Sequence, residues 1–282
     1  MMTLGDLARG ISARWRGGAA SVSVLRLEGV IGGRGRRGLT LQRYAGAIDR
    51  AFAPKTLKGV ALAINSPGGS PAQSQLIYRR IRQLAQERGV PVFAFAEDVA
   101  ASGGYWLALA ADEIYAEETS LLGSIGVVSA GFGFAQVLER LGVERRLHAS
   151  GENKSLLDPF LPEKPHDIER LATLQRDLHE TFKALVHARR GARLKGEDEA
   201  LMTGDIFTGK SALALGLIDG IGELRGVMRQ RFGEQVRLRP IVPRRRRMAF
   251  LPFRRRTPDV ADLVADIVSW AEERVIWARF GL

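Results

Sequence analysis

Short apolar runs alternate with helical segments through the N-terminal third of the chain, and this alternation restricts the fold more than any other feature. Residues 22–27 alternate apolar and polar side chains as a half-buried strand does, whereas residues 59–65 and 91–96 are continuous apolar runs typical of buried strands. Helical spacing separates these strands in residues 40–52 and again in a segment that ends at Gly89. The order strand, helix, strand, helix, strand predicts an α/β fold with parallel strands and right-handed crossovers.

Two glycine-containing loops follow the second and third of these predicted strands. Ligands collect beyond the carboxyl ends of parallel strands, so both loops lie where a site is expected. The first loop reads Asn-Ser-Pro-Gly-Gly-Ser at residues 65–70. Its glycines allow a backbone conformation that turns the N–H of Gly68 outward, as a donor to an oxyanion. An ordinary tight turn before a helix is the alternative interpretation.

Ser102 lies in the second loop, within Ala-Ala-Ser-Gly-Gly-Tyr at residues 100–105. Helix-forming residues follow, so we expect Ser102 at a strand-to-helix turn, close to the amides of a helix N-terminus. The N–H of Gly103 is then a second candidate oxyanion donor. A serine in this place is alternatively a helix N-cap. To act as a nucleophile it needs a base that removes its proton.

Lys154, which lies 52 residues after Ser102, is the best candidate for that base. It follows a short strand predicted at residues 144–148. The histidines have a poorer context, because His179 and His187 belong to a long charged helical stretch that suggests exposure to solvent. A lysine can act as a base when its surroundings keep it neutral. The alternative interpretation of Lys154 is a solvated surface charge.

These motifs, taken in order, resemble the signal peptide peptidases of serine protease family S49. The resemblance covers residues 22–224. It rests on six segments: Ser-Pro-Gly-Gly at 66–69, Ala-Ala-Ser-Gly-Gly-Tyr at 100–105, Leu-Gly-Ser-Ile-Gly-Val at 122–127, Ser-Gly-x-x-Lys-Ser at 150–155, Asp-Ile-Phe-Thr-Gly-Lys-Ser-Ala at 205–212 and Gly-Leu-Ile-Asp-Gly at 216–220.

The resemblance implies a crotonase/Clp protease-like fold and a serine endopeptidase with a Ser/Lys dyad. By position, Ser102 matches the nucleophile, Lys154 the general base and Ser124 the hydroxyl that holds the lysine amine. Gly68 and Gly103 match the oxyanion donors. The family also implies a ring-like homo-oligomer, such as an octamer, in which the serine and the lysine of one site come from neighbouring subunits.

The expected chemistry places conditions on the residues around the dyad. A lysine amine stays neutral only where water is excluded and no carboxylate contacts it, so we expect Glu152 and Asp158 to point away from the amine. Apolar residues near the motifs favour extended peptides with small or apolar side chains, such as signal peptide remnants. The residues expected to line the substrate site are Gly69, Leu122, Val127 and Phe160.

The strong positive charge of the chain is concentrated near its C-terminus. Seven arginines at residues 244–247 and 254–256 account for much of the formal charge of +11, and removing them leaves +4, so no nucleic-acid partner is expected. Apolar residues between 260 and 271 then follow helical spacing, which suggests contact with lipid, with a partner's groove or with the body of the protein. We therefore divide the chain into an N-terminal segment (1–20), a peptidase domain (21–235) and a basic linker with an amphipathic helix (236–282).

The composition excludes several other classes of site. Without cysteine there can be no disulfide, thiolate metal site or cysteine nucleophile, and we expect neither a cofactor nor a metal. No apolar run reaches the length of a membrane span, so we expect a cytoplasmic protein with peripheral membrane contact. Two alternative functions are a crotonase-like acyl-CoA enzyme and a catalytically silent peptide-binding scaffold.

Overall fold

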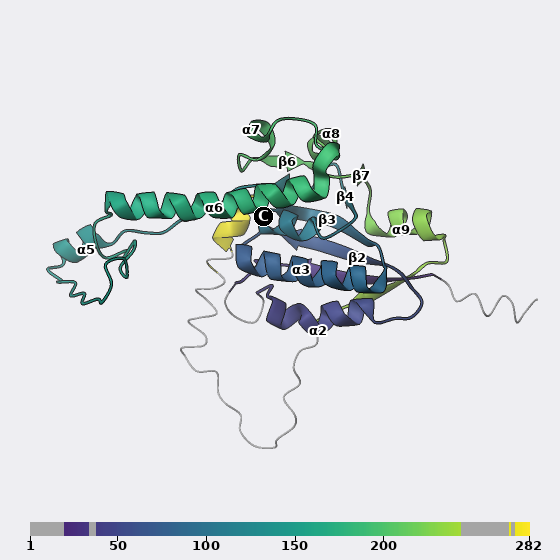
Figure 1. Cartoon of the computed structure of the whole chain (residues 1–282), viewed down its shortest axis with the longest axis horizontal. Coiled ribbons are helices and arrows are strands. Elements are labelled where there is room, and N and C mark those ends of the chain that lie inside the picture. Colours follow the sequence, from purple (N-terminus) through teal and green to yellow (C-terminus); the bar gives the residue numbers. More distant parts are fainter. Residues whose placement is uncertain (1–19, 34–37, 244–270, 272–273) are drawn as a thin grey trace, which may run out of the picture.

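A mostly parallel β-sheet runs through the protein (Figure 1). The computed structural model describes residues 20–33, 38–243, 271 and 274–282. In this part of the chain the strand order is β6-β5-β3-β2-β1-β8, with β4 between β3 and β7. Among the strands that the structure describes, only β5 and β6 pair antiparallel. The strands are β1 (Ser21–Glu28), β2 (Leu57–Ser66), β3 (Val92–Ala101), β4 (Glu113–Ala116), β5 (Leu121–Gly123), β6 (Ile206–Thr208), β7 (Gly220–Ile221) and β8 (Arg237–Ile241).

Helices connect these strands, and local capping explains where several of them begin and end. Thr40 accepts a hydrogen bond from the Arg43 N–H at the start of α2, and Gly89 ends α3 in the left-handed conformation. The helices are α2 (Leu41–Phe52), α3 (Pro71–Arg88), α4 (Gly103–Ala108), α5 (Ala135–Arg140), α6 (Pro165–Arg190), α7 (Asp198–Leu201), α8 (Gly209–Ala214) and α9 (Leu224–Phe232).

The structure confirms the predicted α/β class and the order of the first elements, but it corrects one predicted strand. Residues 144–148 form an exposed coil. They lie away from the sheet, where no strand of the described residues offers the hydrogen bonds that a strand needs. The sheet also continues past residue 235, because β8 pairs with β1. The arginine clusters and most of the predicted amphipathic helix lie outside the described residues.

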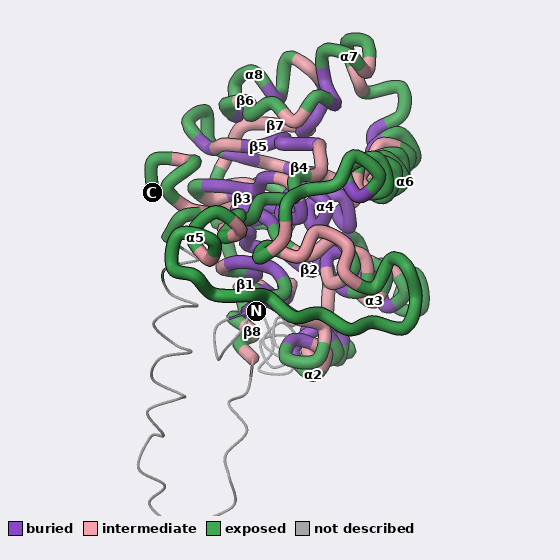
Figure 2. The backbone as a smooth tube through the Cα atoms, turned by 90° about the vertical axis from the view of Figure 1, so that its left-hand side faces the viewer, coloured by how far each residue is buried: buried purple, intermediate pink, exposed green. Residues whose placement is uncertain are grey.

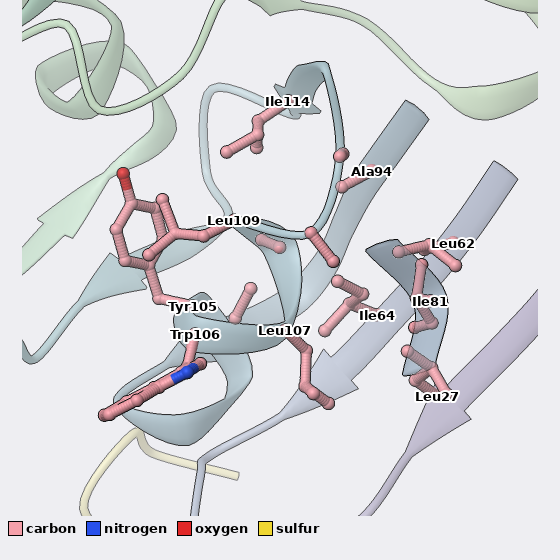
Figure 3. Packing of buried hydrophobic residues seen from close by; sticks show 14 of the residues in the cluster. Leu27, Leu62, Ile64, Ile81, Ala94, Tyr105, Trp106, Leu107, Leu109 and Ile114 are labelled. Atoms are coloured by element: carbon pink, nitrogen blue, oxygen red, sulfur yellow. The ribbon is translucent and has the colours of Figure 1, made fainter. Parts of the chain in front are cut away.

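The two faces of the sheet are covered unequally. Figure 2 shows α2, α3 and α6 on one side of the buried strands and the C-terminus on the other. The helical side holds the larger core, and Figure 3 shows part of it, where α4 packs among side chains of β2 and α3. The smaller core on the other side is formed by Val22, Ala61, Phe93, Phe95 and Met228, the last contributed by α9.

One segment projects from this body, and we call residues 127–178 the arm. It contains α5, the coil that follows and the N-terminal half of α6, and Figure 1 shows it extending beyond the end of the sheet. Asp167 is the one residue of the arm that is buried. Many large apolar side chains of the arm are instead exposed: Val128, Phe132, Phe134, Val137, Leu141, Val143, Leu147, Phe160, Ile168, Leu174 and Leu178.

Helices long and apolar enough to cross a membrane do not occur in the described part of the chain.

Candidate active site

Ser102 occupies the turn between β3 and α4, as the sequence predicts. Its backbone is held in an uncommon conformation (φ 53°, ψ −120°) by two hydrogen bonds, from its N–H to the Gly123 carbonyl (2.8 Å) and from the Trp106 N–H to its carbonyl (3.0 Å). A non-glycine residue with positive φ costs on the order of 1–3 kcal/mol, and such residues cluster at functional sites. The half-buried hydroxyl makes no capping bond to α4. Ser102 therefore does not act as the side-chain cap of this helix.

The two predicted glycine loops lie directly against each other. A Cβ added to Gly68 would be 2.8 Å from both the Ser102 Cβ and the Gly103 nitrogen. A Cβ added to Gly104 would be 2.4 Å from the Ser66 carbonyl oxygen. Real Cβ atoms do not approach other atoms so closely, so this contact requires glycine on both sides.

Three backbone N–H groups lie around the Ser102 turn. The N–H of Gly103 has no hydrogen-bond partner among the described residues, and that of Gly68 makes a long bond of 3.2 Å to Ser66 Oγ. The nitrogen of Gly69 would be 3.3 Å from a Cβ placed on Gly103. Ile31 fixes this loop, because its N–H donates to the Gly68 carbonyl and its carbonyl accepts from the Ser70 N–H, each at 2.8 Å. The arrangement offers N–H donors to a developing oxyanion.

Ser124 follows β5, which pairs with the end of β3 and so brings this serine toward Ser102. Ala101 is paired with Gly123, whose carbonyl accepts the Ser102 N–H. Ser124 also has positive φ (49°), and its N–H donates to the Asp205 carbonyl at 2.6 Å. Ser124 is only 9% exposed. The sheet thus brings the two predicted serines together from segments that are distant in sequence.

Lys154 does not join these residues within a single chain. It is exposed in the coil between α5 and α6, which Figure 1 shows out on the arm. Its side chain makes no hydrogen bond or ion pair with any described residue, so neither Glu152 nor Asp158 contacts the amine. The Asp158 carboxylate instead accepts from the Phe160 N–H (3.0 Å) and from Arg145 (2.9 Å), and both hydrogen bonds lower its pKa.

The residues expected to line the substrate site are in different environments. Leu122 is wholly buried in the core, where its side chain stabilises the sheet beside Ser124. Val127 is half-buried at the start of the arm. Phe160 is 39% exposed on the arm, where its ring stacks on Phe134 with the ring centroids 5.6 Å apart. Gly69 belongs to the glycine loop beside Ser102.

His179 corrects the expectation that the histidines of the long helix are exposed. It is half-buried, and its Nε2 lies 3.0 Å from the carbonyl oxygen of Ile125, the residue after Ser124. Three residues further along α6, Phe182 is buried and stacks on Trp106 of α4. The spacing of His179, Phe182 and Val186 on one helix face is the sequence signal that could have revealed this contact.

A separate cavity of about 710 Å³ opens on the second face of the sheet. Its walls include Phe95, Glu97 and Leu121 of the strand region together with Phe280 and Leu282 from the C-terminus. Neither Ser102 nor Lys154 lines it. Within the described ranges no group of three or more His, Asp or Glu residues is arranged to hold a metal ion.

The model of peptidase family S49 matches residues 84–236, which is more than half of the chain and includes Ser102, Ser124 and Lys154. The chain belongs to peptidase family S49. This confirms the resemblance found in the sequence and the assignment to the serine proteases. Relatives include the chloroplastic serine protease SPPA of Arabidopsis thaliana, 37% identical over 171 residues (60% of this chain, 25% of that protein). The putative signal peptide peptidase SppA of Enterococcus faecium is 30% identical over 213 residues (73% of this chain, 61% of that protein).

A Brucella abortus protein named Na(+)/H(+) antiporter NhaA is 47% identical over 289 residues, which is 99% of this chain and 39% of that protein. A Brucella melitensis protein of the same name matches to the same extent. The S49 chain thus spans well under half the length of these two relatives. Because the aligned region includes the residues matched by the S49 family, the part that they share with this chain is a peptidase region.

Solved structures with the same fold include the 1510-N membrane-bound stomatin-specific protease. A serine-to-alanine mutant of that protein superimposes with a TM-score of 0.50 at 17% identity, covering 80% of this chain and 99% of the other. A lysine-to-alanine mutant in complex with a substrate peptide gives a TM-score of 0.50 at 16% identity, covering 88% and 99%. These similarities confirm the predicted fold.

Proposed function

We propose that this S49 chain is a serine endopeptidase that uses a Ser102/Lys154 dyad. Ser102 Oγ attacks a peptide carbonyl carbon while the Lys154 amine takes its proton, which leaves an anionic tetrahedral intermediate. The intermediate collapses to an acyl-enzyme as the lysine returns the proton to the leaving amine. Water, deprotonated by the same lysine, then hydrolyses the ester and frees Ser102.

The observation that carries this proposal is the backbone of Ser102. Ser102 has a strained backbone, and its hydroxyl makes no capping bond to α4. This serine lies beside the amides of Gly68, Gly69 and Gly103. Donors in this position stabilise the negative charge of the intermediate, and one such donor contributes about 2.7–4 kcal/mol in a serine protease. An ordinary turn before a helix does not need the close contact between the two glycine loops. This contact therefore supports a functional role for the amides.

The position of Lys154 supports an active site shared between two copies of the chain. Its loop lies on the arm, away from Ser102, and the exposed apolar side chains of the arm need a protein surface to cover them. A copy that docks on the arm would bring its own Ser102 and Ser124 to this lysine. Contacts between unlike surfaces of identical chains form a ring when the rotation between neighbours closes, and we propose a ring-like homo-oligomer such as an octamer. The Ser124 hydroxyl would then orient the lysine amine.

The proposed substrates are extended peptides with small or apolar side chains, such as remnants of signal peptides. Relatives named as signal peptide peptidases and a neighbour named as a stomatin-specific protease support this class. The exposed apolar side chains of Phe160 and Phe134 offer contacts of the same character. We propose that the protein acts in the cytoplasm, in peripheral contact with the membrane.

Fluorophosphonate labelling of the purified full chain tests the nucleophile. We expect the reagent to modify Ser102 and to abolish peptide hydrolysis, and Ser102→Ala to lose both labelling and hydrolysis. Ser211→Ala is the matched control, because Ser211 is an exposed serine in the first turn of α8, whose Oγ lies 3.2 Å from Thr208 Oγ1. Peptide cleavage retained by Ser102→Ala would contradict the proposal. Turnover of an acyl-CoA thioester without fluorophosphonate labelling would instead indicate crotonase-like chemistry.

A further inference from the structure

One face of α6 contacts two segments next to the predicted catalytic serines: the turn after β5 that contains Ser124, and α4, which follows Ser102. His179 reaches the turn that contains Ser124, because its Nε2 lies 3.0 Å from the Ile125 carbonyl oxygen. A carbonyl can only accept a hydrogen bond, so this nitrogen carries the proton and donates it. Phe182, one turn along the same face, stacks on Trp106 with the ring centroids 4.5 Å apart. The backbone N–H of Trp106 in turn donates to the Ser102 carbonyl oxygen.

The Ser124 turn has two anchors, one on each side. On the β6 side, the Ser124 N–H donates to the Asp205 carbonyl at 2.6 Å. On the α6 side, His179 holds the next carbonyl, that of Ile125, whose side chain is fully buried. A serine with φ of 49° keeps this conformation only where its surroundings fix it, so both anchors bear on the direction of the Ser124 hydroxyl.

The bond from His179 is also the last one before the chain leaves the body. After Ile125, no hydrogen bond holds the chain until the Phe134 N–H donates to the Pro159 carbonyl, among the bonds found for the described residues. The side chains from Val128 to Phe134 in this stretch are exposed. His179 therefore separates a fixed turn from a segment with few restraints.

We propose that His179 is a positioning residue, which fixes the Ser124 turn against α6 so that the Ser124 hydroxyl meets the lysine amine in the right place. The inference rests on the proposed function, in which Ser124 orients Lys154 of the dyad. The same helix carries the arm at its other end. A neighbouring copy that docks on the arm would thus act on the helix that also holds Ser102, through Phe182 and Trp106.

Substitutions at His179 separate the hydrogen bond from the bulk of the ring. His179→Phe keeps a ring without the N–H, and His179→Asn keeps an amide that is too short to reach the Ile125 carbonyl. His179→Gln places an amide nitrogen near the position of Nε2 and restores a donor. We expect His179→Phe and His179→Asn to lower kcat about 10²-fold, because small displacements of catalytic groups have effects of this size. We expect KM to stay within about twofold and His179→Gln to recover most of kcat.

His187→Phe is the matched control. His187 lies on the same helix, but its Nε2 contacts the Asp198 carboxylate at 3.1 Å, away from the Ser124 turn. The control should keep the wild-type kcat. Thermal unfolding of every variant shows whether it is folded. If His179→Phe does not fold, His179→Asn tests the loss of the hydrogen bond instead.

Hydrogen exchange of the peptide that spans residues 121–128 gives a readout besides activity. We expect faster exchange in His179→Asn than in wild type or His179→Gln, in a Ser102→Ala background that removes turnover. Wild-type kcat in both His179→Phe and His179→Asn would overturn the positioning role and leave the proposed function intact. A loss of kcat in His179→Gln equal to that in His179→Phe would also overturn the positioning role. A wild-type protein that neither hydrolyses peptides nor reacts with fluorophosphonate would overturn the proposed function, and the inference with it.

Discussion

The body and the arm of this protein differ in what their apolar residues do. In the body, residues such as Leu62, Ile64 and Trp106 are buried in a continuous core. In the arm, residues such as Phe132 and Leu141 are 82% and 69% exposed. The body holds Ser102 and Ser124, and the arm holds Lys154. The proposed nucleophile therefore lies in a packed part of the chain, whereas the proposed base lies in an exposed part.

Local contacts give the arm a shape without a core. Asp167, its one buried residue, accepts a hydrogen bond from the Leu157 N–H at 3.3 Å. Arg145 lies over the ring of Phe160, which stacks on Phe134. Such contacts are individually weak, with an aromatic pair contributing about 0.5–1.5 kcal/mol. This difference in packing agrees with the proposed docking of another copy on the arm.

Mixing two inactive variants gives the largest expected effect and tests whether the site is shared. Ser102→Ala and Lys154→Ala should each reduce hydrolysis to background. If the two residues of one site come from different chains, co-refolded variants combine an intact serine with an intact lysine at about a quarter of the sites in a ring. We expect recovery to about that fraction of wild-type activity, measured by peptide hydrolysis.

The control is a mixture of Ser102→Ala with the double variant Ser102→Ala/Lys154→Ala, which contains no intact nucleophile and should stay inactive. Full inactivity of the first mixture, in oligomers shown to contain both variants, would mean that each site takes its serine and lysine from one chain.

Truncating one leucine in each region tests the contrast in packing. Leu62→Ala removes a fully buried side chain from the body and should lower the free energy of unfolding by about 2–5 kcal/mol. Leu141→Ala, on the exposed arm, should change it by no more than about 0.5 kcal/mol at concentrations where the chain is monomeric. Urea denaturation followed by circular dichroism measures both. Equal effects of the two substitutions would show that the arm is packed in the isolated chain.

A charge on the arm should break assembly while leaving the fold intact. Phe132→Glu places a carboxylate on the most exposed aromatic side chain of the arm, where docking would have to bury it unpaired. We expect sedimentation to show smaller species, with hydrolysis reduced about 10²-fold because fewer sites receive their lysine. Leu76→Glu, on an exposed position of α3, is the matched control and should assemble normally. Loss of assembly in both variants would count against the arm as the interface.

The sequence predicts the body much better than the arm, because the signals for the body are local. Alternating apolar and polar residues mark β1, continuous apolar runs mark β2 and β3, and small residues around Ser102 mark the turn after β3. The strand predicted at residues 144–148 is wrong, since its pattern carries no information on whether a partner strand lies beside it. The spacing of His179, Phe182 and Val186 indicates a buried helix face, but it does not identify Ile125, which is 54 residues away, as the partner of His179.

Acidification should have the smallest effect, and it should act on the arm. The Phe160 N–H and Arg145 lower the pKa of Asp158 below its ordinary value of 3.8, so the ionised carboxylate favours the folded arm. A lowered pKa in the folded state gives a contribution that is complete above about pH 4 and is lost as the pH falls through the folded value. We expect the amide resonance of Phe160 to shift over this acidic range, and Asp158→Asn to abolish the shift. A resonance that follows the ordinary titration of an aspartate would show that these contacts do not form in solution, and that the arm lacks even its local order until a neighbouring copy covers it.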